Sequence, residues 1–183
     1  MLHDAGEHDV PDLAAAEDSR HLVFVPLGGS SLDLWISRLE EFNRPEFYVF
    51  DRDNAPPADP HYAAQADEIN QRDNCTVWHT GKRELENYIH KDVIVEDWAA
   101  YSGTNTEFED VPFLLAQAVH ETSESDCEWA EVVDNQVKLK KKVSAAKKRL
   151  NSHMAKRVTP ELLTSVDPND DVRTWLRAIG ATL

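Results

Sequence analysis

The chain is poor in cysteine and has no long apolar run, and both shortages restrict what it can be. Cys75 and Cys127, its only cysteines in 183 residues, lie far apart and match no metal-binding spacing. They predict a reducing compartment and no disulfide framework. No apolar stretch approaches the roughly 20 residues that span a bilayer, and the polar start at Met1 does not resemble a signal peptide. We therefore expect a soluble cytoplasmic protein with no membrane partner.

Basic residues are also scarce: 19 lysines and arginines face 34 acidic residues, which gives a net charge of −15. Such a charge argues against a general affinity for nucleic acid. The exception is the basic segment, residues 138–157, which holds nine of the 19 basic residues and no acid. A run of this kind is usually a solvated helix face, but its lack of acids favours contact with phosphates. The candidate DNA-binding residues are Lys141, Lys142, Lys147, Lys148 and Arg149.

Strand and helix patterns alternate in the first half of the chain. Short apolar segments predict strands at 22–25, 47–50 and 76–79. Helices are expected from Asp9, which would be the N-cap, at 31–42, after Asp59-Pro60 and at 82–89. Alternation of this kind is typical of an α/β domain with a parallel sheet, here residues 1–100.

The second half reads as helical, residues 101–183. Apolar residues recur every three or four positions over 132–154, which predicts one long amphipathic helix with its lysines outside. Further helices are expected at 113–122, from Thr159-Pro160 onward, and over 172–179.

Two acidic residues follow directly on the apolar run Phe47-Tyr48-Val49-Phe50. Asp51 and Asp53 lie where this strand ends, before the break at Pro56-Pro57. In an open parallel sheet the carboxyl edge is where ligands bind. Carboxylates two residues apart on extended backbone point the same way, and such oxygens suit Mg²⁺ or Mn²⁺. The alternative is an acidic loop that caps the next helix.

Four motifs in this order and spacing resemble the TOPRIM domain of the OLD (overcoming lysogenization defect) nucleases, which include phage-defence effectors. They are Ala5-Gly6-Glu7-His8-Asp9, Leu27-Gly28-Gly29-Ser30, Asp51-Arg52-Asp53 and Arg83-Glu84-Leu85-Glu86-Asn87-Tyr88. The basic segment followed by Trp175-Leu176 is similar to the C-terminal part of that family. The resemblance covers roughly residues 5–180.

The resemblance implies a TOPRIM-like parallel sheet flanked by helices, with a helical C-terminal appendage, and a site for one or two Mg²⁺ or Mn²⁺ ions. It implies Asp9, Asp51 and Asp53 as metal ligands. The family's leading glutamate is replaced by Ala5, so Glu7 is the substitute ligand. Catalytic candidates are Glu7, Asp51, Asp53 and, at the phosphate, Lys147, although Lys148 is an alternative. Glu86 is expected to support the ligands from behind.

The function implied is that of a metal-dependent DNA endonuclease, with DNA as its partner. No nucleotide site is visible, so the ATPase domain usual in this family would be lost or would lie in another chain. A second copy of the chain is a further candidate partner. Because Ala5 departs from the motif, we expect a fragment of a longer protein or a degenerate site. Two alternatives stay open: a catalytically inactive TOPRIM module that binds DNA or a protein, and an acidic interaction domain without a metal site.

Overall fold

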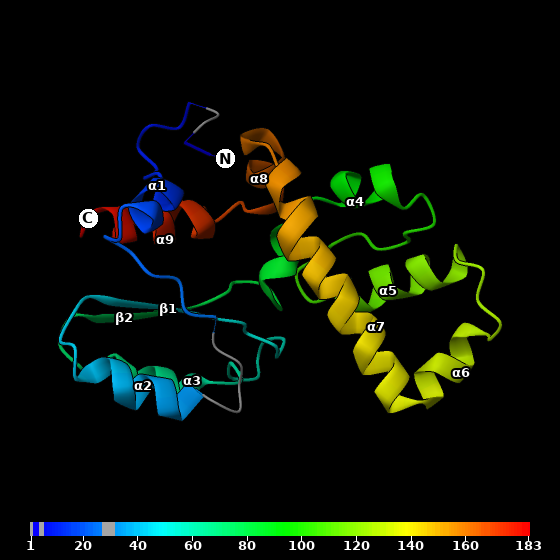
Figure 1. The fold of residues 1–183 in the computed structure, drawn as a ribbon, viewed down its shortest axis with the longest axis horizontal. Coiled ribbons are helices and arrows are strands. Elements are labelled where there is room, and N and C mark those ends of the chain that lie inside the picture. Colours follow the sequence, from blue (N-terminus) through cyan, green and yellow to red (C-terminus); the bar gives the residue numbers. More distant parts are fainter. Residues whose placement is uncertain (1, 4–5, 27–31) are drawn as a thin grey trace.

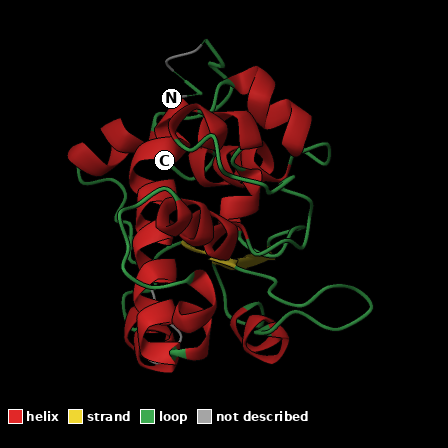
Figure 2. Ribbon diagram, turned by 90° about the vertical axis from the view of Figure 1, so that its right-hand side faces the viewer, coloured by secondary structure: helices red, strands yellow, loops and turns green. Residues whose placement is uncertain are grey.

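The computed structural model describes residues 2–3, 6–26 and 32–183, and it combines many helices with a small sheet (Figures 1 and 2). The first-half elements are α1 (Leu13–Asp18), α2 (Leu32–Glu40), β1 (Glu46–Phe50), α3 (Ala63–Ile69), β2 (Cys75–His79), the 3₁₀-helix η2 (Leu85–Tyr88) and α4 (Lys91–Asp97). The second-half elements are α5 (Val111–Glu121), α6 (Trp129–Asp134), α7 (Gln136–Arg149), the π-helix η3 (Leu150–Met154), the 3₁₀-helix η4 (Ala155–Arg157), α8 (Pro160–Val166) and α9 (Asp171–Gly180). The motif Leu27-Gly28-Gly29-Ser30 and Ala5 lie outside the described residues.

The two strands are parallel, as the sequence predicts, with Glu46 opposite Cys75 and Phe50 opposite His79. Tyr48 and Phe50 belong to a small core on the side of α2 and α3, below the strands in Figure 1. Val49 and Trp78 pack against a larger, helical core instead. Both faces of the sheet are therefore covered, which is the usual condition of parallel strands.

The prediction of a strand at 22–25 is wrong. Residues 22–26 have no regular secondary structure, and the side chains of Val23 and Phe24 are 73% and 52% exposed. A strand needs a neighbour to pair its backbone N–H and C=O groups. The apolar pattern carries no information about that neighbour, and the sheet in the described residues has two strands.

The predicted helix at 31–42 is confirmed in its described part by α2, but other first-half boundaries differ. Asp12, not Asp9, caps α1, where its Oδ1 accepts a hydrogen bond of 3.0 Å from Ala15 N. The helix expected after Asp59-Pro60 begins only at Ala63. The helix expected at 82–89 is wrong, because this segment is a loop followed by η2. In it, Asn87 Oδ1 accepts a hydrogen bond from Glu84 N, so a side chain replaces helical backbone pairing.

The long helix predicted over 132–154 is interrupted at Asn135. This residue ends α6 with non-helical dihedral angles (φ −102°, ψ 94°) and begins α7 as its N-cap, accepting from Lys138 N at 3.1 Å. Asparagine favours such caps because its side chain competes for backbone groups. Beyond Arg149 the helix widens into η3. The predictions for α5, α8 and α9 are confirmed, including Thr159 as the N-cap of α8.

The larger core joins both halves of the chain. It contains residues from both sides of the boundary predicted near residue 100, such as Ile94, Leu115 and Leu150, each fully buried. The long helix α7 packs on α5 and α6 (Figure 1). None of the helices in the described residues has the length and apolar character needed to cross a membrane. Cys75 and Cys127 are both free, as expected.

Candidate metal centre

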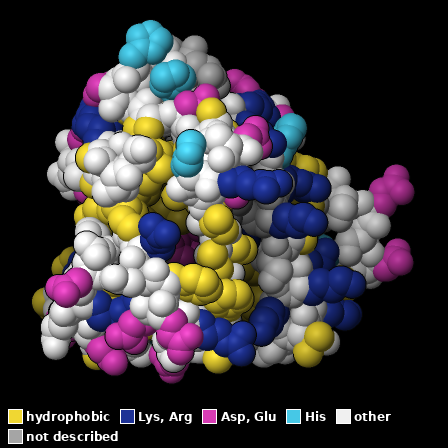
Figure 3. All heavy atoms as spheres, turned by 60° about the vertical axis from the view of Figure 1, so that its left-hand side comes forward, with side chains coloured by type: hydrophobic (Ala, Val, Ile, Leu, Met, Phe, Trp, Pro, Cys, Tyr) yellow, Lys and Arg dark blue, Asp and Glu magenta, His cyan; other side chains and the backbone are white. Residues whose placement is uncertain are grey.

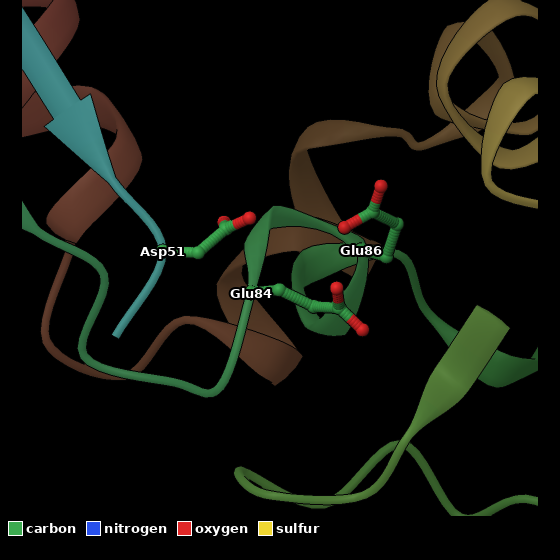
Figure 4. Close-up of side chains that lie close together, drawn as sticks. All are labelled: Asp51, Glu84 and Glu86. Carbon is green, nitrogen blue, oxygen red and sulfur yellow. The ribbon is translucent and has the colours of Figure 1, made fainter. Parts of the chain in front are cut away.

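Three carboxylates from two separate segments meet at the carboxyl end of the sheet. Asp51 follows β1 directly, whereas Glu84 and Glu86 come from the loop after β2 and from η2. One oxygen of each lies within 4.8 Å of the others (Figure 4). Parallel strands end at one edge, so β1 and the chain leaving β2 deliver their side chains to the same place. We call these three residues the acidic cluster.

Lys147 of α7 reaches into the acidic cluster. Its Nζ lies 2.8 Å from Glu84 Oε2 and 3.5 Å from both Asp51 Oδ2 and Glu86 Oε2. In the described part of the chain, no other cation lies within 4.0 Å of these carboxylates. Three negative charges against one positive charge leave two negative charges without a partner when all groups are ionised.

Hydrogen bonds fix the carboxylates in place. Leu85 N donates to Asp51 Oδ1 at 3.0 Å, and Asn151 Nδ2 donates to Glu86 Oε1 at 2.7 Å. Glu86 is fully buried, yet its Oε2 has no hydrogen-bond partner among the described residues. Asn151 belongs to the π-helix η3, and π-helical turns occur frequently at functional sites. A buried carboxylate oxygen that lacks a donor is costly unless a cation or another ligand reaches it.

Burial sets the protonation of the cluster. It raises the pKa of Glu84 and of Glu86 above the ordinary range, and the nearby positive charge of Lys147 only partly offsets this effect. Burial would lower the pKa of Lys147, but the hydrogen bond to Glu84 and the charges of Glu86 and Asp51 outweigh it, so that pKa is raised. Lys147 is therefore held as a cation, while the two glutamates are held less firmly as anions.

Such an arrangement could hold a metal ion. It offers oxygen atoms only, from carboxylates on two segments, with an excess of negative charge. The ammonium of Lys147 already takes the place of a cation among them. Its side chain is 39% exposed, so it has a route out toward solvent if a metal ion displaces it.

The structure brings together part of the site predicted from sequence. Asp51, Lys147 and Glu86 lie in the acidic cluster, and Glu86 presents an oxygen to it rather than standing behind it. Asp53 is not a member. It is exposed, has a left-handed backbone (φ 58°) and donates from its N to Arg83 O. The strand ends at Phe50, so the alternation that would align Asp53 with Asp51 no longer holds.

Glu7 and Asp9 are also outside the acidic cluster and are bound by arginines of α9. Glu7 receives two hydrogen bonds of 2.7 Å from Arg173, and Asp9 receives one of 2.8 Å from Arg177. The hydrogen bond from Arg177 lowers the pKa of Asp9. Both carboxylates are held at α9 by these arginines and so do not take part in the acidic cluster.

Sequence reasoning missed Glu84 and Asn151. Glu84 stands two residues from Glu86 in Glu84-Leu85-Glu86, the same spacing that drew attention to Asp51 and Asp53. Asn151 is four residues from Lys147, so the two share a helix face. Both signals are present in the sequence, but neither reveals that the face of α7 turns toward the loop after β2.

The basic segment divides between several environments. Lys147 points into the acidic cluster, Arg149 lies 4.9 Å above the ring of Trp98, and Lys142 is half-buried. Lys141 and Lys148 are exposed and, in the described part of the chain, form no ion pair within 4.0 Å. Figure 3 shows a face on which lysine and arginine side chains gather beside a hollow of hydrophobic side chains.

Comparison of the chain with protein-family models, curated proteins and solved structures gave no match.

Proposed function

We propose that the chain is a divalent-metal-dependent nuclease that hydrolyses phosphodiester bonds in DNA. The observation that carries this proposal is the convergence of Asp51, Glu84 and Glu86 around a lysine at the carboxyl edge of a parallel sheet. Carboxylate oxygens in this number suit Mg²⁺ or Mn²⁺. The partial likeness to TOPRIM nucleases supports the same reading, since Asp51, Glu86 and Lys147 come from the segments that carry it.

The three carboxylates would hold the ion, which when bound polarises a phosphodiester oxygen and activates water. Asp51 is oriented for this by Leu85 N, and Glu86 by Asn151. Before a metal binds, Lys147 balances one of the three negative charges. Once released, its ammonium lies beside the site and can donate to a non-bridging phosphate oxygen, a charge-assisted hydrogen bond.

DNA is the substrate that the basic residues of α7 favour. Lys141 and Lys148 are exposed on the helix that delivers Lys147, so a phosphate backbone that contacts them runs toward the acidic cluster. The remainder of the chain is strongly acidic and would repel DNA elsewhere. The contact surface would therefore be confined to this side of α7.

Metal binding is the first test. We expect Mg²⁺ or Mn²⁺ to raise the melting temperature, because a ligand at a hundred times its Kd stabilises the native state by about 2.7 kcal/mol. Asp51→Asn and Glu86→Gln should abolish the shift. Asp53→Asn is the matched comparison, an acid from the same loop outside the cluster, and should keep it. Loss of the shift in Asp53→Asn alone would refute the site described here.

Activity is the second test. We expect weak, EDTA-sensitive nicking of supercoiled plasmid that is faster with Mn²⁺ than with Mg²⁺, because Mg²⁺ demands near-ideal octahedral geometry and must compete with Lys147. Asp51→Asn should remove the nicking. Nicking that survives both EDTA and Asp51→Asn would come from another source and would contradict the proposal.

A second function follows from the position of Lys147. Its ammonium already forms ion pairs with all three carboxylates, which is also how a purely structural network is built. The chain would then be an inactive TOPRIM-like module that binds DNA through α7. A metal titration separates the two, because the module would bind DNA without any melting shift from Mg²⁺ or Mn²⁺. An acidic interaction domain would show neither response.

A further inference from the structure

A cavity lies beside Lys82, two residues before Glu84 in the chain. It has a volume of about 670 Å³ and is bounded by the start of α4, the loop 104–108 and the end of α8. Cavities of 300–1,000 Å³ are typical of small-ligand sites. None of the acidic cluster lines it, so it is separate from the candidate metal centre.

Lys82 is the unusual residue in its wall. The side chain is buried, with the residue 8% exposed, and its Nζ has one hydrogen-bond acceptor, Asn87 O at 3.3 Å. The ring of Tyr88 lies 5.4 Å from the same atom. In the described residues no carboxylate lies within 4.0 Å of Lys82 Nζ. An ammonium has three donors, so two of them have no partner in the described chain.

The acids around Lys82 are engaged elsewhere or too distant. Asp167 accepts hydrogen bonds from Asp171 N and Val172 N, and the carboxylate of Asp171 accepts from Tyr88 OH. Glu107 is the remaining acid near Lys82, and among the described residues none of the three forms an ion pair with its Nζ. A buried cation without a close counter-ion is destabilising. The ammonium of Lys82 is therefore a buried charge that a bound anion would balance.

Other donors line the same cavity. Lys91 is exposed at its edge, and His90 Nδ1 accepts from Asp92 N, which leaves Nε2 as the protonated nitrogen of the neutral ring. In the lining of the cavity, two lysines thus stand against one acid, Glu107, while Asp167 and Asp171 lie near Lys82 outside the lining. The donors left without partners on Lys82, rather than a large excess of positive charge, make the cavity suited to an anion.

We propose that this cavity binds the phosphate group of a small molecule, with Lys82 as its buried counter-ion and His90 and Lys91 as donors at its mouth. Phosphate offers several acceptor oxygens to donors that arrive from different directions, as Lys82 and Lys91 do. The ligand could be inorganic phosphate or a mononucleotide, whose base would have room in the cavity beside Phe108. This site is independent of the proposed nuclease activity.

Calorimetric titration in EDTA tests the proposal, because no metal ion can then recruit phosphate to the acidic cluster. The probes are inorganic phosphate, adenosine monophosphate and, as a control, adenosine. We expect both phosphates to bind and adenosine not to bind. Tighter binding of adenosine monophosphate than of inorganic phosphate would identify a nucleotide site, and equal affinity a phosphate site.

Lys82→Met should weaken phosphate binding at least about tenfold. Its melting temperature without phosphate should equal or exceed that of the wild type, since an unbalanced buried charge is removed. Lys91→Met, at the exposed edge of the cavity, should weaken phosphate binding several-fold. This second variant tests the site even if Lys82→Met does not fold. Lys156→Met, an exposed lysine outside the cavity, should bind as the wild type does. Absence of phosphate binding by the wild type, or unchanged affinity in Lys82→Met, would overturn the proposal.

Discussion

At the scale of single residues, the acidic cluster is an arrangement in which each charge depends on its neighbours. Glu86 is fully buried and needs Lys147 and Asn151 to remain ionised. Because burial raises the pKa of Glu84 and Glu86, the folded chain binds protons more tightly than the unfolded chain. Stability and metal affinity should therefore both depend on pH.

We expect the metal-free protein to lose stability as pH rises. The contribution of a raised carboxyl pKa is complete below the unfolded value, about 4.3 for glutamate, and is lost as pH rises through the folded value. The raised pKa of Lys147 adds a constant stabilisation until its unfolded value of about 10.4 is approached. Urea unfolding at a series of pH values measures this dependence.

Glu86→Gln is the variant for this measurement. This variant should lose less stability than the wild type as pH rises. Burial also raises the pKa of other acids such as Asp167, and the difference between the two proteins isolates the contribution of Glu86. Glu131→Gln, an exposed acid on α6, should keep the wild-type slope. If the Glu86→Gln and wild-type curves stay parallel, Glu86 does not titrate in this range.

At the scale of elements, α7 joins the candidate metal centre to a possible DNA surface. At 100° per residue, Lys140 lies on nearly the same side of the helix as Lys147, about 10.5 Å away along the axis. Lys141 and Lys148 form a second row about 100–120° around the helix from Lys147, and Lys138 lies about 180° from Lys147. The helix periodicity thus divides the basic segment into a row beside the site and residues directed elsewhere.

The salt dependence of DNA binding tests this division. On duplex DNA each neutralised phosphate contributes a slope of about −0.9 to the plot of log affinity against log salt. Lys141→Glu with Lys148→Glu should flatten the slope by up to about 1.8, whereas Lys156→Glu, an exposed lysine beyond the end of α7, should leave it unchanged. Fluorescence anisotropy with a labelled duplex measures it. Equal effects of all three substitutions would mean that the basic residues act only through net charge.

At the scale of the whole molecule, the two ends of the described chain are fastened to each other. Arg173 of α9 is 7% exposed and binds Glu7 through two hydrogen bonds of 2.7 Å. Arg177 binds Asp9 beside it. Figure 1 shows α1 beside α9. Glu7 and Asp9 thus serve the fold rather than the candidate metal centre.

Glu7→Gln distinguishes this role from that of a metal ligand. Breaking a fully buried ion pair costs about 3–5 kcal/mol, but the Glu7 side chain is 22% exposed and Asp170 remains beside Arg173, so the cost here should be smaller. We expect a lower melting temperature and an unchanged further rise on adding Mg²⁺ or Mn²⁺. A variant of normal stability that no longer responds to metal would restore Glu7 as a ligand.

The sequence alone determined those helices and strands whose signals lie within the element itself. Hydrophobic periodicity predicted β1, β2, α5 and α9, and the acidic residue at the end of β1 indicated the sheet edge as the site. The sequence also pointed to the pair Lys147-Lys148, and the structure places Lys147 among the carboxylates. Only the tertiary structure decided which acids meet. Asp51 gains Glu84 and Glu86 because the loop after β2 crosses the same edge, whereas Glu7 and Asp9 are drawn to α9. Which distant charges become neighbours depends on packing between elements, and no periodicity within one element encodes it.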